Sequence, residues 1–178
     1  WLLLEVVKKN NGDTFLVSNV FQVFDSIFAN ENIDKVKLNA AMASILKLKP
    51  SIKDTIVATS WIGVIQKGCI TLSKVSQEDF FYVELANVFR LMSEYLSSET
   101  ASVNGKAATC LISIVNFGIQ QSFLIDEAQD EMKIDQTVGS LANIIQDFLS
   151  SIRFSHSLPH VLHIATALIS KLSLKSAP

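Results

Sequence analysis

The feature that most constrains this chain is the spacing of its apolar residues, which recur every three or four positions along nearly its whole length. An α-helix has about 3.6 residues per turn, so this spacing gathers apolar side chains on one helix face. We find no stretch of sustained apolar–polar alternation bounded by hairpin turn signals. The pattern therefore predicts an all-α fold without a sheet.

The helical pattern runs through eight segments. Asp13 is an expected N-cap, and residues 16–28 carry two apolar stripes, which predict a helix covered on two sides. Their members are Leu16, Val20, Val23 and Ile27 in one stripe, and Val17, Phe21, Phe24 and Phe28 in the other. The opening run WLLLEVVKK is a further segment, and the other stripes start near residues 38, 57, 81, 103, 138 and 161.

The segments group into four antiparallel helical pairs, beginning near residues 1, 33, 77 and 133. This spacing is close to the period of about 40–47 residues typical of HEAT and armadillo repeats. One pair cannot bury enough apolar surface to stand alone, so neighbouring pairs must stack. We expect a HEAT/armadillo-like α-α superhelix of about four pairs. Residues 1–178 would form a single solenoid segment, a fragment of a longer repeat protein, because the chain opens on what reads as the last turns of a helix.

Composition sets limits on partners. The net charge of −2 gives no global reason to bind nucleic acid, so any such contact must be local. The most apolar run, residues 56–72, is interrupted by Gln66 and Lys67, and we expect no membrane span. Cys69 and Cys110 lie in apolar stripes, which favours buried free thiols in a reducing compartment over a disulfide or metal pair.

Two short stretches together imitate an ATPase. The run FLIDEAQD at residues 123–130 resembles a Mg²⁺-binding strand end, and Asn104-Gly105-Lys106 resembles a phosphate loop. However, Thr100 replaces the first glycine of that loop, and Ala107 replaces the hydroxyl residue that would bind Mg²⁺. The acidic motif also lacks a sheet. We therefore expect Asp126, Glu127, Asp130 and Glu131 to form an acidic loop, while Phe123, Leu124 and Ile125 pack on the solenoid edge.

Residues 103–114 are better explained as a helix of a repeat. Their layout, V-x-x-x-A-A-x-x-L-x-x-I, resembles the second helix of a HEAT repeat. The small pair Ala107 and Ala108 would allow two helices to approach closely, and Leu111 and Ile114 would fill the contact between them. Residues 98–102 would form the turn inside the repeat.

No constellation in the sequence indicates catalysis or a cofactor. The three histidines, His156, His160 and His163, are conceivable metal ligands, but no Cys, Asp or Glu lies nearby in the sequence to complete a tetrahedral site. Helix-cap or surface positions are the simpler interpretation. The sequence thus predicts no enzyme, no metal, no cofactor and no small-molecule substrate.

The candidate contact residues are basic. Lys47, Lys49 and Lys53 surround Pro50 in a turn between helices, and could meet phosphate or an acidic protein surface. An ordinary solvated loop is the alternative interpretation. Lys106 and Arg153 are further candidates. A polar helix face at Glu84, Asn87, Arg90 and Glu94 is interpreted as plain surface, with Arg90 and Glu94 as an i,i+4 ion pair.

The C-terminal third carries a family resemblance. The run VGSLAN at 138–143 leads through FLS at 148–150 to IRFSH at 152–156, and then to a helix ending ALISKL at 167–172. Together with residues 96–113, this is similar to the ribosomal RNA-processing protein twelve family, HEAT-repeat factors of small-subunit assembly. Ser157 and Asn104 depart from the family pattern, where Cys and Arg are expected.

The resemblance implies a non-catalytic scaffold in ribosome biogenesis. Such a protein would bind pre-ribosomal proteins and rRNA during maturation and export, with the nuclear export machinery as a further partner. It would reside in the nucleolus and nucleus and could shuttle to the cytoplasm. Arg153 is the motif residue carried over as a contact. The alternative function is a HEAT-repeat nuclear transport receptor or adaptor that binds cargo or a small GTPase.

Overall fold

The computed structural model describes residues 2–10, 12–30, 32–75, 80–119, 143, 146 and 162–166. These residues contain the following helices: α1 (Leu2–Lys9), α2 (Thr14–Phe28), α3 (Lys35–Leu46), α4 (Thr55–Val75), α5 (Phe80–Leu96) and α6 (Ala101–Ser113). A π-helical segment, η1 (Ile114–Ile119), directly continues α6. The described residues include no strand, which confirms the all-α prediction for this part of the chain.

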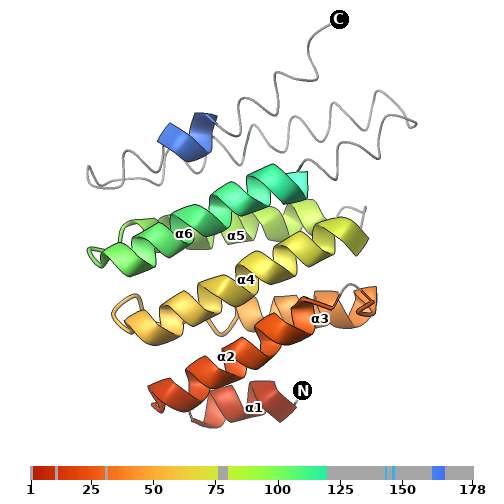
Figure 1. Ribbon diagram of the computed structural model, residues 1–178, viewed down its shortest axis with the longest axis vertical. Helices are drawn as coiled ribbons and strands as arrows, with labels where there is room; N and C mark the ends of the chain where they lie inside the picture. The colour runs from red at the N-terminus through yellow and green to blue at the C-terminus, as the bar shows by residue number, and fades with distance from the viewer. Residues whose placement is uncertain are drawn as a thin grey trace, which may run out of the picture.

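The helices are arranged in two layers (Figure 1). Helices α2, α4 and α6 lie side by side in one layer, and α1, α3 and α5 form the other. Each helix of the first layer pairs with the helix that precedes it in the chain. The first three predicted pairs are therefore confirmed, whereas the fourth, expected from residue 133, lies almost entirely outside the described residues.

Aspartates cap the N-termini of α2, α3 and α4. Asp13 accepts a hydrogen bond from the Leu16 amide at 2.9 Å, and Asp34 accepts one from the Lys37 amide at 2.9 Å. Asp54 does the same for α4, accepting from the Val57 amide at 3.3 Å through Oδ1. Such caps satisfy amides that have no partner inside the helix. The Oδ2 atom of Asp54 also accepts from Thr14 Oγ1 at 3.1 Å, which ties the start of α4 to the start of α2.

Helix α4 is the centre of the core. It contacts α2, α3 and α6, and the side chains of Trp61, Ile62, Val64 and Ile65 are fully buried. Its residues Thr55–Lys74 are long and apolar enough to cross a membrane by length and composition, contrary to our expectation for this run. More than half of that window is buried inside the protein, and a helix covered by neighbours on several sides is apolar for that reason.

Contacts inside the second pair are tight and largely apolar. Inside the pair, Trp61 Nε1 donates to the Ile45 carbonyl of α3 at 2.9 Å, while the same indole packs on Tyr95 of α5 in the next pair, with 5.4 Å between ring centroids. Gly68 of α4 lies directly against Met42 of α3, so that a Cβ at this glycine would overlap the methionine sulfur. Here the absence of a side chain is required by the close approach of the two helices.

Contacts between successive pairs include polar bonds. Between α2 and α4, the hydroxyls of Ser18 and Ser60 lie 2.7 Å apart, and buried Thr71 donates to the Phe28 carbonyl at 2.7 Å. Between α4 and α6, Gln66 Nε2 donates to Ser113 Oγ at 2.8 Å. These bonds link helices that run in the same direction and are distant in sequence.

The prediction that α2 is covered on two sides holds only for the first half of one stripe, in which Val20 is buried and Leu16 is half-buried. Val17, Phe21, Phe24 and Phe28 are buried, but Val23 and Ile27 keep 45% and 41% of their surface exposed. Helix α1, which pairs with α2, spans only eight residues against fifteen in α2, so part of the apolar surface of α2 remains uncovered.

The prediction of a HEAT-like second helix at residues 103–114 is confirmed. Helix α6 begins at Ala101, and Ala107, Ala108, Leu111 and Ile114 are all buried. Asn104-Gly105-Lys106 lies inside this helix and not in a loop, so these residues cannot form the phosphate loop of an ATPase. The FLIDEAQD stretch and the predicted acidic loop lie outside the described residues.

Candidate partner-binding surface

The three lysines around Pro50 occupy the connection between α3 and α4. Lys47 is the C-cap residue of α3, and Lys49 and Lys53 follow in the exposed turn. A lysine at a helix C-terminus is favourable, because it faces the partial negative charge of the last carbonyls. The three lysines thus lie in one connection, but their side chains have different contacts.

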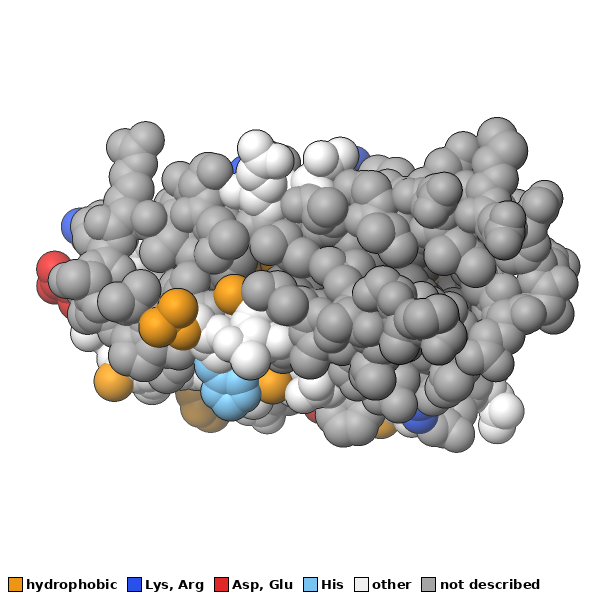
Figure 2. All heavy atoms as spheres, turned by 90° about the horizontal axis from the view of Figure 1, so that it is seen from above, with side chains coloured by type: hydrophobic (Ala, Val, Ile, Leu, Met, Phe, Trp, Pro, Cys, Tyr) orange, Lys and Arg blue, Asp and Glu red, His pale blue; other side chains and the backbone are white. Residues whose placement is uncertain are grey.

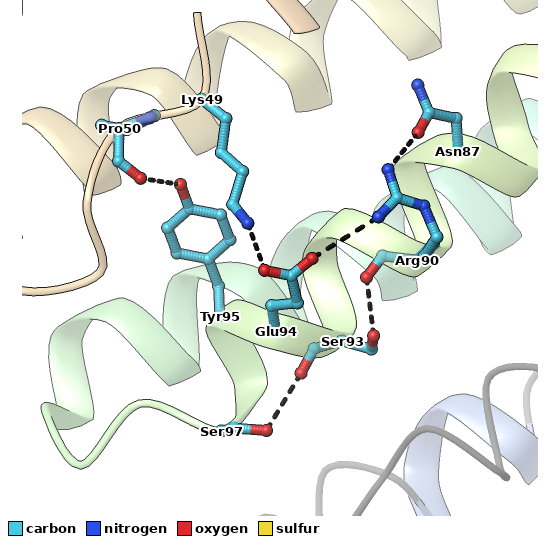
Figure 3. A network of polar contacts seen from close by, with 8 residues as sticks. All are labelled: Lys49, Pro50, Asn87, Arg90, Ser93, Glu94, Tyr95 and Ser97. Carbon is cyan, nitrogen blue, oxygen red and sulfur yellow. Dashed lines mark hydrogen bonds and ion pairs between the residues drawn. The ribbon is translucent and has the colours of Figure 1, made fainter. Parts of the chain in front are cut away.

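Lys49 is engaged in an intramolecular network (Figure 3). Its ammonium pairs with the Glu94 carboxylate of α5 and lies 5.9 Å from the centroid of the Tyr95 ring. Glu94 also pairs with Arg90 at 3.6 Å, and Arg90 donates to Asn87 Oδ1 at 2.9 Å. The predicted Arg90–Glu94 pair is thus confirmed. Because its charge is already neutralised, Lys49 is the least available of the three lysines for a partner.

Tyr95 of α5 also contacts the turn that contains Pro50. Its hydroxyl donates to the Pro50 carbonyl at 2.6 Å, and its ring is buried. Burial raises the pKa of the Tyr95 phenol well above its usual range, and the negative charge of Glu94 acts in the same direction. The phenol is therefore neutral and remains a donor at ordinary pH. The turn is anchored to α5 by one neutral and one charged contact.

Lys47 and Lys53 remain exposed. Among the residues that the structure describes, neither forms an ion pair. These two side chains are what remains of the predicted basic cluster as a free surface.

Lys106 lies elsewhere, on α6. It is half-buried, and its Cε atom would lie 3.8 Å from a Cβ placed on Gly63 of α4, so its aliphatic stem crosses the seam between these helices. It is therefore separate from the Pro50 turn. Lys67, one helical turn beyond Gly63, is also half-buried and was not predicted as a contact. The absence of any carboxylate in residues 55–75 was the signal that could have drawn attention to it.

The thiols are buried, as predicted. Neither Cys69 nor Cys110 forms a disulfide, and both side chains are buried. Burial raises the pKa of the Cys110 thiol, Cys69 adds to this effect, and Lys106 partly opposes it. Both the burial and the raised pKa disfavour the thiolate that a nucleophile or metal ligand would require at Cys110.

Of the remaining predicted residues, the structure describes only His163. His163 is exposed, and Figure 2 shows a histidine side chain at the surface. His156, His160 and Arg153 lie outside the described residues. In the part of the chain that the structure describes, no group of three or more His, Cys, Asp or Glu side chains could hold a metal ion.

The stacked, antiparallel helical pairs define an α-helical repeat protein of the HEAT class. Residues 97–178 match the family model described as ribosomal RNA-processing protein 12, HEAT repeats. The resemblance drawn from the motifs is therefore confirmed, and the chain is related to the ribosomal RNA-processing protein 12 family.

Two relatives show how far this similarity extends. Ribosomal RNA-processing protein 12 of Saccharomyces cerevisiae is 32% identical over 99% of this chain. A similarly named protein of Schizosaccharomyces pombe is 24% identical over 89% of the chain. The chain spans 15% and 13% of the lengths of these two relatives. No solved structure matches it.

Proposed function

We propose that the chain acts as part of a non-catalytic scaffold in small ribosomal subunit biogenesis. It would bind pre-ribosomal particles, through protein and rRNA partners, during their maturation and export. The observation that carries this proposal is the 32% identity to a protein named for ribosomal RNA processing, which extends over 99% of the chain. The site of action would be the nucleolus and nucleus, with shuttling to the cytoplasm.

The stacked helical pairs also support a binding role. Stacked helical pairs present long continuous surfaces on which several partners can be held. The polar side chains of Thr71, Gln66 and Ser18 are used in helix–helix bonds. These polar side chains thus hold the stacked helices together, and the exposed surface of the stack stays open to partners, as a scaffold requires.

We also propose that residues 1–178 form one solenoid segment of a longer array. The partly exposed Val23 and Ile27 of α2 support this. Counted from the capping residues Asp13 and Asp54, they occupy the same helix positions as Val64 and Gly68 of α4, which are buried. Val23 and Ile27 thus lie at positions that are covered by neighbours in an internal pair.

Purification of the full-length protein from cells, with sequencing of the RNA that accompanies it, tests the function. Enrichment of ribosomal precursor RNA in fractions that sediment as pre-ribosomal particles is the expected result. Ordinary messenger RNA, or no RNA, would contradict it. The alternative, a nuclear transport receptor or adaptor, would instead show nucleotide-dependent binding to a small GTPase and no association with precursor particles.

A further inference from the structure

In the layer formed by α2, α4 and α6, positive and negative side chains lie on different helices. Residues 55–75 and 101–119, which make up α4, α6 and η1, contain only three charged residues. All three, Lys67, Lys74 and Lys106, are lysines, although acidic residues outnumber basic ones 17 to 15 in the whole chain. Helices α4 and α6 are therefore locally positive in a chain whose net charge is −2, whereas α2 carries one charged residue, Asp25.

Two of these lysines lie close together across the seam between α4 and α6. The Lys106 stem lies over Gly63, and Lys67 follows Gly63 by four residues, which is about one helical turn. Both side chains are half-exposed, and neither forms an ion pair with another described residue. Their ammonium groups are therefore available at the surface where α4 and α6 meet.

The groups between these lysines are small or polar. Gly63 has no side chain, Gln66 bonds Ser113 across the seam, and Thr109 is exposed on α6. The one large exposed apolar side chain of α4, Ile56, lies two turns away at the first turn of the helix. Protein interfaces usually have an apolar or aromatic centre, whereas nucleic-acid backbones are contacted by Lys together with Ser, Thr, Asn and Gln.

We propose that this seam surface, defined by Gly63, Gln66, Lys67, Lys106 and Thr109, binds the phosphate backbone of RNA. The inference rests on the proposed function for the presence of RNA as a partner, and on the charge distribution for the location. It moves the main contact from the Pro50 turn, where Lys49 is neutralised by Glu94, to the layer of second helices. Binding there is independent of base sequence, because none of the aromatic side chains that the structure describes is exposed at the seam to stack on a base.

The test uses the full-length protein with Lys67 and Lys106 both replaced by glutamine, which removes two charges and keeps much of each stem. The matched control replaces Lys47 and Lys53 by glutamine, the same charge change in the Pro50 turn. Binding to one single-stranded RNA of ribosomal precursor sequence and one of unrelated sequence is measured at several salt concentrations. Circular dichroism and thermal unfolding verify that each variant is folded.

The seam variant should bind both RNAs on the order of tenfold more weakly, and the slope of log K against log salt should fall by about 1.4, or about 0.7 per lost contact. The control should change much less. Equal losses in both variants, or unchanged RNA affinity in the seam variant, would overturn the proposal. So would unchanged RNA affinity combined with lost binding to an acidic protein, which would make the seam a protein-docking surface.

A failure of the proposed function can be distinguished from a failure of the surface assignment. If the unsubstituted protein binds RNA through the seam but does not co-sediment with pre-ribosomal particles, the function is wrong and the surface assignment stands. If the protein co-sediments and the seam variant does so equally well, with unchanged RNA affinity, the surface assignment is wrong and the function stands.

Discussion

Helix α4 meets its own partner α3 in a different way from its neighbours in the same layer. Inside the pair, Gly68 lets α3 and α4 approach until Met42 lies against the α4 backbone, and the Trp61 indole donates to the Ile45 carbonyl of α3. Between pairs, α2, α4 and α6 are joined partly by hydroxyl and amide bonds at Ser60, Thr71 and Gln66. Apolar packing is strong but not directional, whereas hydrogen bonds require one alignment. Both kinds of contact contain apolar packing, and the hydrogen bonds between pairs additionally fix the alignment of α2, α4 and α6.

The largest effect should come from removing the centre of the pair. Trp61→Ala should lower the free energy of unfolding by about 3–5 kcal/mol, because the side chain is fully buried and its removal leaves a cavity. Urea-induced unfolding measures this loss. Trp61→Phe should retain most of the packing and lose only the bond to the Ile45 carbonyl. A loss below about 1 kcal/mol for the alanine variant would mean that the pair is not packed as described.

Filling the close contact should be the next most damaging change. Gly68→Val should cost about 1–3 kcal/mol, because the added side chain overlaps Met42, which is itself buried. Gly105→Ala is the matched control, since nothing lies within 4 Å of a Cβ at that glycine. It should raise stability by about 0.5–1 kcal/mol, as alanine favours a helix. Thermal unfolding that ranks the two variants in the opposite order would contradict the close approach of α3 and α4.

Breaking one seam bond should have a smaller effect. Thr71→Val removes the hydroxyl that donates to the Phe28 carbonyl and should cost about 0.5–1.5 kcal/mol. Hydrogen exchange of the last turn of α2 should rise by more than that of α3, because the bond ends on α2. Equal acceleration in α2 and α3 would show that Thr71 contributes only general stability and not alignment.

The smallest effect at neutral pH should come from Tyr95→Phe, which removes the bond to Pro50 and should cost about 0.5 kcal/mol. The pH dependence is more informative. The folded protein holds the Tyr95 proton more tightly than the unfolded chain, in which a tyrosine has a pKa of about 10. Stability from this group is therefore complete below about pH 10 and lost as the pH rises further. Unfolding curves between neutral and alkaline pH should show a decline that Tyr95→Phe reduces. Identical declines would exclude a buried, neutral phenol.

Much of the fold could be predicted from apolar spacing, because a helix that packs on neighbours must carry an apolar face. The pairs and the role of residues 103–114 followed from this. The same spacing could not show how many neighbours α2 has, since Val23 and Ile27 are apolar whether or not a helix covers them.

The contact surface was harder to predict, because charges act on neighbours in space. Lys49 and Glu94 are 45 residues apart, and nothing local in the sequence announces their pairing. Lys67 stood out at first only as an interruption of an apolar run. Its relation to Lys106 depends on the stacking of α4 on α6, which becomes visible only once the helices are placed in space.

The carboxylate of Asp54 makes two contacts at once, with Oδ1 on the Val57 amide and Oδ2 on the Thr14 hydroxyl. The group that starts α4 is thus also a contact to the preceding pair. In a linear array, cooperativity depends on how much of each unit's stability comes from its neighbours. The same Asp54 carboxylate caps α4 and contacts α2. Unfolding of the first pair should therefore weaken the start of α4, and unfolding should spread along the array.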